Sequence, residues 1–253
     1  MTRQDDAWKN ASLARTYLEG VRGAIPLAGE QLDVVLRLIA ARGEGVQCLA
    51  DLGCGDGILA RTILLRHPNA TAVLVDFSEP MLRQARSQLA GDRVGTHFVE
   101  ADLGEPEWVE AIARHAPFDV VVSGYAIHHQ PDSRKRELYR EVFALLEPDG
   151  LFINTEHVAS RTRWVESISD ELFIDSLYAF QRRTGSGESR ERVAEKFFHR
   201  PDKAANILAP VETQCEWLRE IGFEDVDCYF KLFELAVFGG RKPQDRVART
   251  ERL

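Results

Sequence analysis

The residues best suited to chemistry begin with an alternating glycine turn, Gly53, Gly55 and Gly57, between a short apolar run and a helical pattern. Glycine permits a sharp strand-to-helix turn and lets a ligand approach the backbone closely. A dinucleotide-binding turn would read GxGxxG, whereas Ile58 stands where its third glycine would be. Asp51, just ahead of the turn, suits a cationic group such as a methionine amino group better than a pyrophosphate. The turn therefore predicts a site for a cationic ligand.

Two further carboxylates follow at the ends of the next two predicted strands. Asp76 is placed to accept hydrogen bonds from two ribose hydroxyls. It could instead cap the next helix, although Ser78 and Glu79 are available for that purpose. Asp102 is placed to accept from an adenine exocyclic amine, with a solvated loop aspartate as the alternative. Because open α/β sheets bind ligands at the carboxyl ends of their strands, we expect these groups in one site.

Candidate bases follow the fourth predicted strand, where His128 and His129 stand side by side in a loop. An imidazole, with an ordinary pKa of about 6.5, is suited to take a proton from an acceptor at neutral pH. Adjacent loop histidines cannot both point the same way. One of them could therefore be the catalytic base, while the other packs on the cofactor or bonds the backbone.

Glu156 and His157 end the fifth predicted strand, and the predicted sheet brings them close to the paired histidines. We expect them to contact the substrate. Two facing histidine loops could also bind a divalent metal. Since neither a helical HxxxH pattern nor a carboxylate cluster supports that alternative, no metal is predicted.

These residues require a sheet in which strands alternate with helices, and that alternation begins at residue 47. Strand patterns occupy residues 47–51, 72–76, 96–100, 120–123 and 151–154. Helical patterns occupy residues 57–67, 79–90, 105–115 and 132–147. Such alternation predicts parallel strands joined by right-handed crossovers, hence an α/β, Rossmann-like, doubly wound sheet. The nearly continuous apolar runs of the fourth and fifth strands indicate that helices cover both sheet faces.

The pattern changes after residue 155. Residues 156–210 are charged and helical, which predicts an inserted cap, and residues 211–253 return to a helix and two apolar runs. The connection between those runs is too short for a parallel crossover, so they should form an antiparallel hairpin that completes a seven-strand sheet. Residues 1–45 read as a helical segment, and residues 46–155 as the cofactor-binding core. In the cap, Tyr178 and Arg182 are substrate candidates, although aromatic residues at helical spacing more often form core.

Composition restricts the class of protein. The chain of 253 residues has 40 acidic and 32 basic residues and a net charge of -8, which does not favour a general nucleic-acid binder. None of the four cysteines has CxxC or zinc-ligand spacing, which is typical of reduced thiols in a cytoplasmic protein. No apolar stretch predicts a signal peptide or a membrane span. The expected partner is a small molecule rather than a membrane or a nucleic acid, and a homodimer is left open.

On the glycine turn with Asp51, and on Asp76 and Asp102 at the following strand ends, the chain resembles the class I S-adenosylmethionine-dependent methyltransferases. The resemblance is strong over residues 45–155 and looser beyond them. It implies S-adenosyl-L-methionine as cofactor, S-adenosyl-L-homocysteine as product, and a small-molecule acceptor methylated at oxygen, nitrogen or carbon. The cofactor residues that we predict are Tyr17, Asp51, Gly53, Cys54, Gly55, Gly57, Asp76, Phe77, Met81, Asp102, Leu103 and Ser123.

A narrower resemblance concerns the two ends of the chain. Residues 17–26, 211–213 and 230–235 look like the branch that contains carboxy-S-adenosylmethionine synthase, whose members serve tRNA wobble-uridine chemistry. That resemblance implies that Arg200 holds the added carboxylate, although its spacing from Glu212 departs from the branch. A third reading is a module that binds the cofactor without turnover. The substrate residues that we predict are Glu156, His157, Tyr178, Arg182 and Arg200.

Overall fold

The computed structural model describes residues 22–89, 95–200, 203 and 205–244. Its strands are β1 (Cys48–Leu52), β2 (Thr71–Asp76), β3 (Thr96–Glu100), β4 (Phe118–Gly124), β5 (Leu146–His157), β6 (Glu224–Leu232) and β7 (Leu235–Arg241). Its α-helices are α2 (Ala28–Ala41), α3 (Ile58–Leu64), α4 (Glu79–Leu89), α5 (Trp108–Ile112), α6 (Asp132–Leu145), α7 (Arg163–Arg183), α8 (Arg190–Phe198) and α9 (Val211–Ile221). Short 3₁₀ turns are η3 (Arg22–Ala24), η4 (Ala113–His115) and η5 (Ile127–His129).

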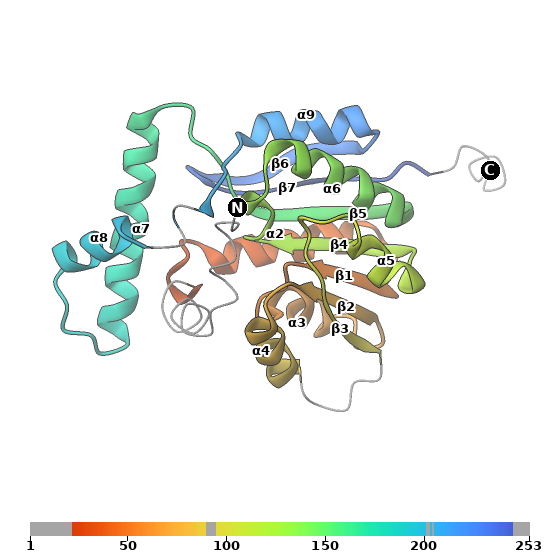
Figure 1. Ribbon diagram of the computed structural model, residues 1–253, viewed down its shortest axis with the longest axis horizontal. Coiled ribbons are helices and arrows are strands. Elements are labelled where there is room, and N and C mark those ends of the chain that lie inside the picture. Colours follow the sequence, from red (N-terminus) through yellow and green to blue (C-terminus); the bar gives the residue numbers. More distant parts are fainter. Residues whose placement is uncertain (1–21, 90–94, 201–202, 204, 245–253) are drawn as a thin grey trace.

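The strands form one seven-stranded sheet in the order β3-β2-β1-β4-β5-β7-β6 (Figure 1). Neighbours from β3 to β5 pair in parallel, whereas β7 pairs antiparallel with both β5 and β6. This arrangement confirms the predicted Rossmann-like sheet and the predicted terminal hairpin. The hairpin does not simply extend the sheet, because its second strand, β7, lies between β5 and β6.

Helices cover both faces of the sheet, as the apolar runs predict. One face packs on α5, α6 and α9 through Trp108, Tyr139 and Leu218, and the other packs on α2, α3 and α4 through Ile39, Ile63 and Leu82. The central strands β2 and β4 are buried along nearly their whole length, as strands covered on both faces should be. The edge strands β3 and β6 are only half-buried. The core is therefore centred on the strands whose ends carry the predicted ligand groups.

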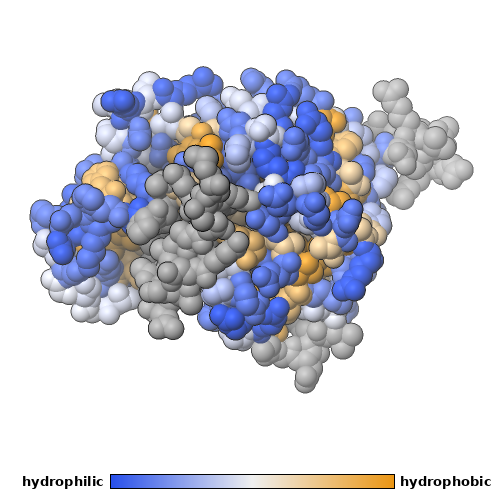
Figure 2. Space-filling view, in the orientation of Figure 1, coloured by the Kyte–Doolittle hydropathy of each residue, from blue (hydrophilic) through white to orange (hydrophobic). Residues whose placement is uncertain are grey.

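Helices α7 and α8 form a hairpin that projects from the sheet, as the left side of Figure 1 shows. The hairpin has an apolar cluster of its own around Ile174, Leu177 and Phe197. Blue, hydrophilic residues cover much of its outer surface in Figure 2. Among the described helices, none is long and apolar enough to cross a membrane.

Most predicted boundaries agree with the structure to within three residues. Strand β5 differs more and begins five residues before the predicted start at 151, where Leu146 pairs with Phe118 of β4. The helix predicted over 105–115 is shorter by three residues at each end, and α5, Trp108–Ile112, is followed by a 3₁₀ turn. Leu32, Val35, Leu36 and Ile39 pack helix α2 against the sheet, within the predicted helical segment. Tyr17, a predicted cofactor residue, lies outside the described residues.

Candidate functional site

A cavity of about 510 Å³ opens at the carboxyl ends of the parallel strands, where open α/β sheets bind ligands. It runs from the glycine turn to the base of the α7–α8 hairpin. The predicted cofactor residues that line it are Asp51, Gly53, Cys54, Gly55, Asp76, Phe77, Met81, Asp102 and Leu103. His128, His129, His157 and Arg200 line the same cavity. One space therefore joins the predicted cofactor groups to the predicted bases.

The glycine turn has the left-handed backbone that makes glycine necessary. Gly53, Gly55 and Gly57 have φ values of 64°, 55° and 77°. A Cβ on Gly53 would lie 2.2 Å from the Cβ of Ala126, whereas a Cβ on Gly55 would have no atom within 4 Å. Gly55 therefore leaves an open cradle beside the cavity, which fits a cofactor that approaches the backbone. Gly57 does not line the cavity, and it precedes α3 and packs on Leu74.

We predict that Gly53→Ala destabilises the protein. The substitution combines a left-handed φ with overlap against Ala126, and overpacking alone costs about 1–3 kcal/mol. Thermal unfolding should show a clear fall in Tm. The matched control is Gly29→Ala in α2, where a Cβ meets no atom within 4 Å and alanine favours the helix. An unchanged Tm for Gly53→Ala would show that the turn is less constrained than its geometry indicates.

Asp76 connects the end of β2 to the glycine turn. Its Oδ2 accepts a hydrogen bond from Gly55 N at 2.8 Å, and its Oδ1 accepts from Ser78 N at 2.8 Å. The second bond lies just before α4, so Asp76 also supports the start of that helix. A carboxylate oxygen has a further lone pair after each bond, so both oxygens keep the capacity to accept from ribose hydroxyls. The structure thus gives Asp76 a place in the cavity that fits the predicted role.

Burial raises the pKa of Asp76 to about 6 from an ordinary value of 3.8, although bonds from Ser78 and Gly55 oppose the rise. The unfolded chain releases this proton near pH 4, so between pH 4 and 6 the folded protein holds more protons. In that window Asp76 makes the ligand-free fold less stable as the pH rises. Ionisation of Asp76 therefore lowers the free energy of unfolding of the ligand-free protein. Such perturbed carboxylates are typical of binding sites.

Cofactor affinity should consequently depend on pH. Ribose hydroxyls donate to the ionised form of Asp76, so below about pH 6 binding must first remove a proton, and Kd should rise by about tenfold per pH unit. Calorimetric titration with S-adenosylhomocysteine between pH 5 and 8 measures this dependence. The Asp76→Asn variant should bind weakly and without the pH 6 inflection. A Kd of the wild type that does not change between pH 5 and 8 would contradict the prediction.

Three other predicted cofactor residues have identifiable structural partners. Asp51 is buried, and its Oδ2 accepts from Ala60 N at 3.0 Å in the first turn of α3. Asp102 lines the cavity, and its Oδ1 accepts from Gly104 N at 2.8 Å. Ser123 is fully buried, donates to Leu52 O, and is not among the cavity-lining residues. Ser123 therefore ties β4 to β1 and does not face the cavity.

His128 is held from behind by a buried carboxylate. Its Nδ1 lies 2.6 Å from Glu156 Oε1, and its backbone N donates to Glu156 Oε2 at 3.0 Å. Glu156 is fully buried and also accepts from His157 N at 2.8 Å. Because the carboxylate accepts, the ring proton stays on Nδ1 and Nε2 is the basic nitrogen. Glu156, predicted to contact substrate, is therefore behind His128 rather than at the cavity wall.

His129 and His157 have different anchors. His129 Nδ1 lies 3.2 Å from Ala205 O, and its ring centroid is 3.9 Å from that of His128. Burial first, and then the neighbouring His128, lower the pKa of His129 well below its ordinary value. His157 Nε2 lies 3.2 Å from Glu234 Oε2, and Glu234 also accepts from Ser160 N. The pairing with His157 and Ser160 leaves the pKa of Glu234 below its ordinary value, although burial opposes it.

Only some of the substrate residues predicted in the cap line the cavity. Arg200 lines the cavity with its guanidinium 5.1 Å from the Phe197 ring centroid. Tyr178 instead packs in the apolar cluster of the α7–α8 hairpin, and Arg182 is exposed on α7. Neither is among the cavity-lining residues. Helical spacing alone did not distinguish the faces of α7.

The cavity residues that sequence reasoning missed include Gln31, Tyr125, Asn206 and Glu234. Tyr125 has a left-handed φ of 53°, and its hydroxyl donates to the buried Gln31 amide at 2.5 Å. Strained backbone of this kind clusters at functional sites, but no sequence pattern marks it in a tyrosine. Asn206 comes from the connection before α9, which carried no motif, and Glu234 comes from the β6–β7 turn, where the resemblance over residues 230–235 implied no role for it. No His, Cys, Asp or Glu group in the described part of the chain has the geometry to hold a metal.

Comparison with known proteins identifies the central part of the chain. A family model described as "Methyltransferase domain" matches residues 49–150. The carboxy-S-adenosyl-L-methionine synthase of Nautilia profundicola is 20% identical, over 89% of this chain and 90% of that protein. An O-methyltransferase family protein from Burkholderia thailandensis superposes with a TM-score of 0.57 at 16% identity, covering 85% of this chain and 58% of that one.

A second solved structure was determined with the cofactor product bound. Magnesium protoporphyrin IX methyltransferase from Synechocystis PCC 6803, with bound SAH, superposes with a TM-score of 0.54 at 16% identity, covering 85% of this chain and 84% of that one. At this identity the superposition establishes the fold. Together with the matched domain and the cradle at Gly55, it agrees with S-adenosylmethionine as the cofactor.

Proposed function

We propose that this chain, whose residues 49–150 form a class I S-adenosylmethionine-dependent methyltransferase domain, methylates a hydroxyl group of a small-molecule acceptor. The observation that carries the proposal is the buried His128–Glu156 pair at the wall of the cavity that contains Asp76. A hydroxyl is a poor nucleophile until it loses its proton, so a positioned base favours an oxygen acceptor. The size of the cavity, about 510 Å³, and the net charge of -8 favour a small molecule over a nucleic acid.

The cofactor supplies an electrophilic methyl group on a sulfonium. Residues of the protein position the cofactor and the acceptor and provide a base. Asp76 accepts from the ribose, while the turn at Gly55 leaves room for the cofactor beside the backbone. His128 Nε2 takes the hydroxyl proton, and the electron pair of the broken O–H bond remains on oxygen. Glu156 fixes the Nδ1–H tautomer and stabilises the imidazolium that forms, the role that a buried carboxylate has behind other catalytic histidines.

His128 and His129 differ in the charge of the groups that anchor them. His129 is anchored to a neutral carbonyl and its lowered pKa keeps it uncharged, whereas His128 has a carboxylate behind it. The carboxylate of Glu156 compensates a positive charge on the His128 ring. Of the two catalytic candidates, we assign the role of base to His128. We assign to His129 the role of holding Ala205 next to the site.

The direct test measures S-adenosylhomocysteine formation with purified protein, S-adenosylmethionine and a panel of hydroxyl and amino acceptors. We expect turnover above the acceptor-free rate for at least one hydroxyl compound. Binding of the cofactor without turnover of any acceptor would favour a non-catalytic cofactor-binding module instead.

A second candidate is an enzyme of the carboxy-S-adenosylmethionine synthase kind, linked to tRNA wobble-uridine modification. Two observations favour it: the similarity to the Nautilia profundicola protein spans 89% of this chain, and Arg200 lines the cavity. An arginine there would bind an added carboxylate. Mass spectrometry of the nucleoside that copurifies separates the candidates, because the carboxylated cofactor is heavier. Recovery of the unmodified cofactor or its homocysteine product alone would remove this second candidate.

A further inference from the structure

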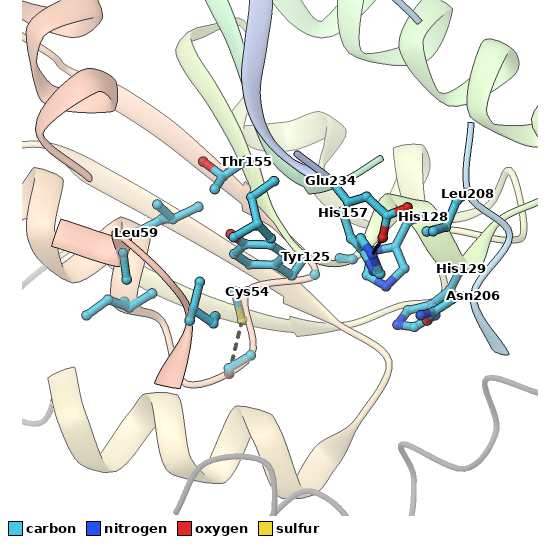
Figure 3. Close-up of a pocket in the computed structure, with 18 of the residues that line it drawn as sticks. Cys54, Leu59, Tyr125, His128, His129, Thr155, His157, Asn206, Leu208 and Glu234 are labelled. Atoms are coloured by element: carbon cyan, nitrogen blue, oxygen red, sulfur yellow. Dashed lines mark hydrogen bonds and ion pairs between the residues drawn. The ribbon is translucent and has the colours of Figure 1, made fainter. Parts of the chain in front are cut away.

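Two histidine–carboxylate pairs, rather than one, face the cavity. His128 is paired with Glu156, and His157 is paired with Glu234, which comes from the turn between β6 and β7. The two imidazole rings meet edge to face with centroids 5.7 Å apart. In Figure 3 they lie next to each other below Glu234, and both line the cavity. The base assigned above uses only the first pair, so the second pair has no role in that assignment.

The two pairs are anchored through opposite ring nitrogens. Glu156 accepts from Nδ1 of His128, which leaves Nε2 to act, whereas Glu234 accepts from Nε2 of His157, which leaves Nδ1. Neither of these remaining nitrogens has a hydrogen-bond partner in the described part of the chain. In its neutral form each ring therefore offers one hydrogen-bond acceptor, and the carboxylate behind it fixes which nitrogen that is. The wall of the site presents two acceptors side by side.

We propose that His128 and His157 together recognise an acceptor with hydroxyl groups on adjacent carbon atoms, a vicinal diol or an ortho-dihydroxy aromatic ring. This inference rests on the proposed function. One hydroxyl donates to His128 Nε2 and loses its proton there, and the neighbouring hydroxyl donates to His157 Nδ1. A single hydroxyl has one hydrogen, so it satisfies only one of the two nitrogens, and the other loses its hydrogen bond to water without replacement. His157 thus determines specificity, and Glu234 is its positioning residue.

A primary amine also has hydrogens for both rings, and in neutral water it is mainly an ammonium ion. The carboxylates of Glu156 and Glu234 lie behind the rings and do not repel that charge. An ammonium nitrogen has no lone pair to accept a methyl group, whereas a hydroxyl oxygen has lone pairs and transfers its proton to His128. The diol therefore matches the proposed function better than the amine.

Calorimetric titration of the protein saturated with S-adenosylhomocysteine tests the proposal with catechol, phenol and benzylamine as probes. Catechol should bind about tenfold more tightly than phenol, the difference expected for one additional net hydrogen bond. His157→Phe keeps a ring of similar size and removes the Nδ1 acceptor, so it should reduce catechol affinity to the level of phenol, and thermal unfolding of the variant checks that the fold is kept. The control His199→Gln changes an exposed histidine at the end of α8 and should alter neither affinity.

Ring-nitrogen NMR of the wild type gives a second readout that does not need a variant. Catechol should shift the resonances of both His128 Nε2 and His157 Nδ1, whereas phenol should shift one of them. Equal affinities for catechol and phenol would overturn the proposal. So would tighter binding of benzylamine, a shift confined to one ring, or no detectable binding of catechol.

The binding experiment tests paired recognition and the turnover experiment tests the proposed activity, so either proposal can be rejected without the other. Neither probe needs to be methylated for its affinity to be measured. Tighter, His157-dependent binding of catechol without S-adenosylhomocysteine formation from any acceptor supports paired recognition and rejects the proposed activity. Methylation of monohydroxy acceptors together with equal binding of catechol and phenol supports the activity and rejects paired recognition.

Discussion

Replacing His128 with Asn is expected to lower kcat for a hydroxyl acceptor by about 10²–10⁴-fold, the usual contribution of a positioned general base. Asparagine keeps a donor near the position of Nδ1, so the bond to Glu156 survives while the basic nitrogen is lost. The fold and the cofactor site should therefore remain intact. KM for the acceptor should rise by about tenfold, because the hydroxyl also loses its ground-state hydrogen bond to Nε2, while the larger loss falls on kcat.

Steady-state formation of S-adenosylhomocysteine measures this effect, with cofactor affinity determined in parallel. Raising the pH should partly restore the variant, since hydroxide can then replace the missing base. The matched control is His97→Asn on β3, whose ring contacts His115 and which does not line the cavity. A kcat of His128→Asn equal to that of the wild type would show that His128 is not the base. Positioning of the acceptor against the methyl group would then account for the rate.

Asp76→Ala is expected to weaken S-adenosylmethionine binding by about 10²-fold or more, since hydrogen bonds to a charged group contribute about 1.5–3 kcal/mol each. The substitution removes the two predicted ribose contacts and also the bond from Gly55 N at 2.8 Å, so the glycine turn loses that support at the same time. The loss should appear in the dissociation constant more than in the number of binding sites.

Isothermal titration of wild type and variant with S-adenosylmethionine gives this comparison. Asp33→Ala is a suitable control, because Asp33 is an exposed carboxylate on α2 that pairs with Arg37. Equal affinity for Asp76→Ala and wild type would contradict the assignment of the cofactor pocket. Thermal unfolding of the ligand-free variant separates a binding defect from a folding defect.

The sheet and the cofactor half of the site were predictable from the sequence for a physical reason. Strand periodicity, glycine spacing and acidic residues at strand ends are local signals, and the rules for parallel crossovers bring those ends together. Gly55, Asp76 and Asp102 are close in space because their strands are neighbours. The family resemblance added the identity of the cofactor, which the spacing alone did not determine.

The acceptor half was less predictable because its residues come from segments without periodic patterns. Glu234 reaches His157 from a turn 77 residues further along the chain, and Ala205 reaches His129 from the connection before α9. Such contacts depend on how the terminal hairpin and the cap return to the sheet. Helical spacing also placed Tyr178 and Arg182 near the substrate, whereas packing within the α7–α8 hairpin directs Tyr178 into an apolar cluster.

The position of β7 between β5 and β6 has a consequence for how the protein is made. Residues 151–157 of β5 pair with residues 235–241 of β7, so one edge of β5 has no partner until a strand some 80 residues later leaves the ribosome. At translation rates of about 5–20 residues per second, the nascent chain exposes this edge for about 4–16 seconds. The same edge carries Glu156 and His157. The sheet beside His157 is therefore completed only by the last strand synthesised in it, and until then the edge of β5 is an open template for pairing with other chains.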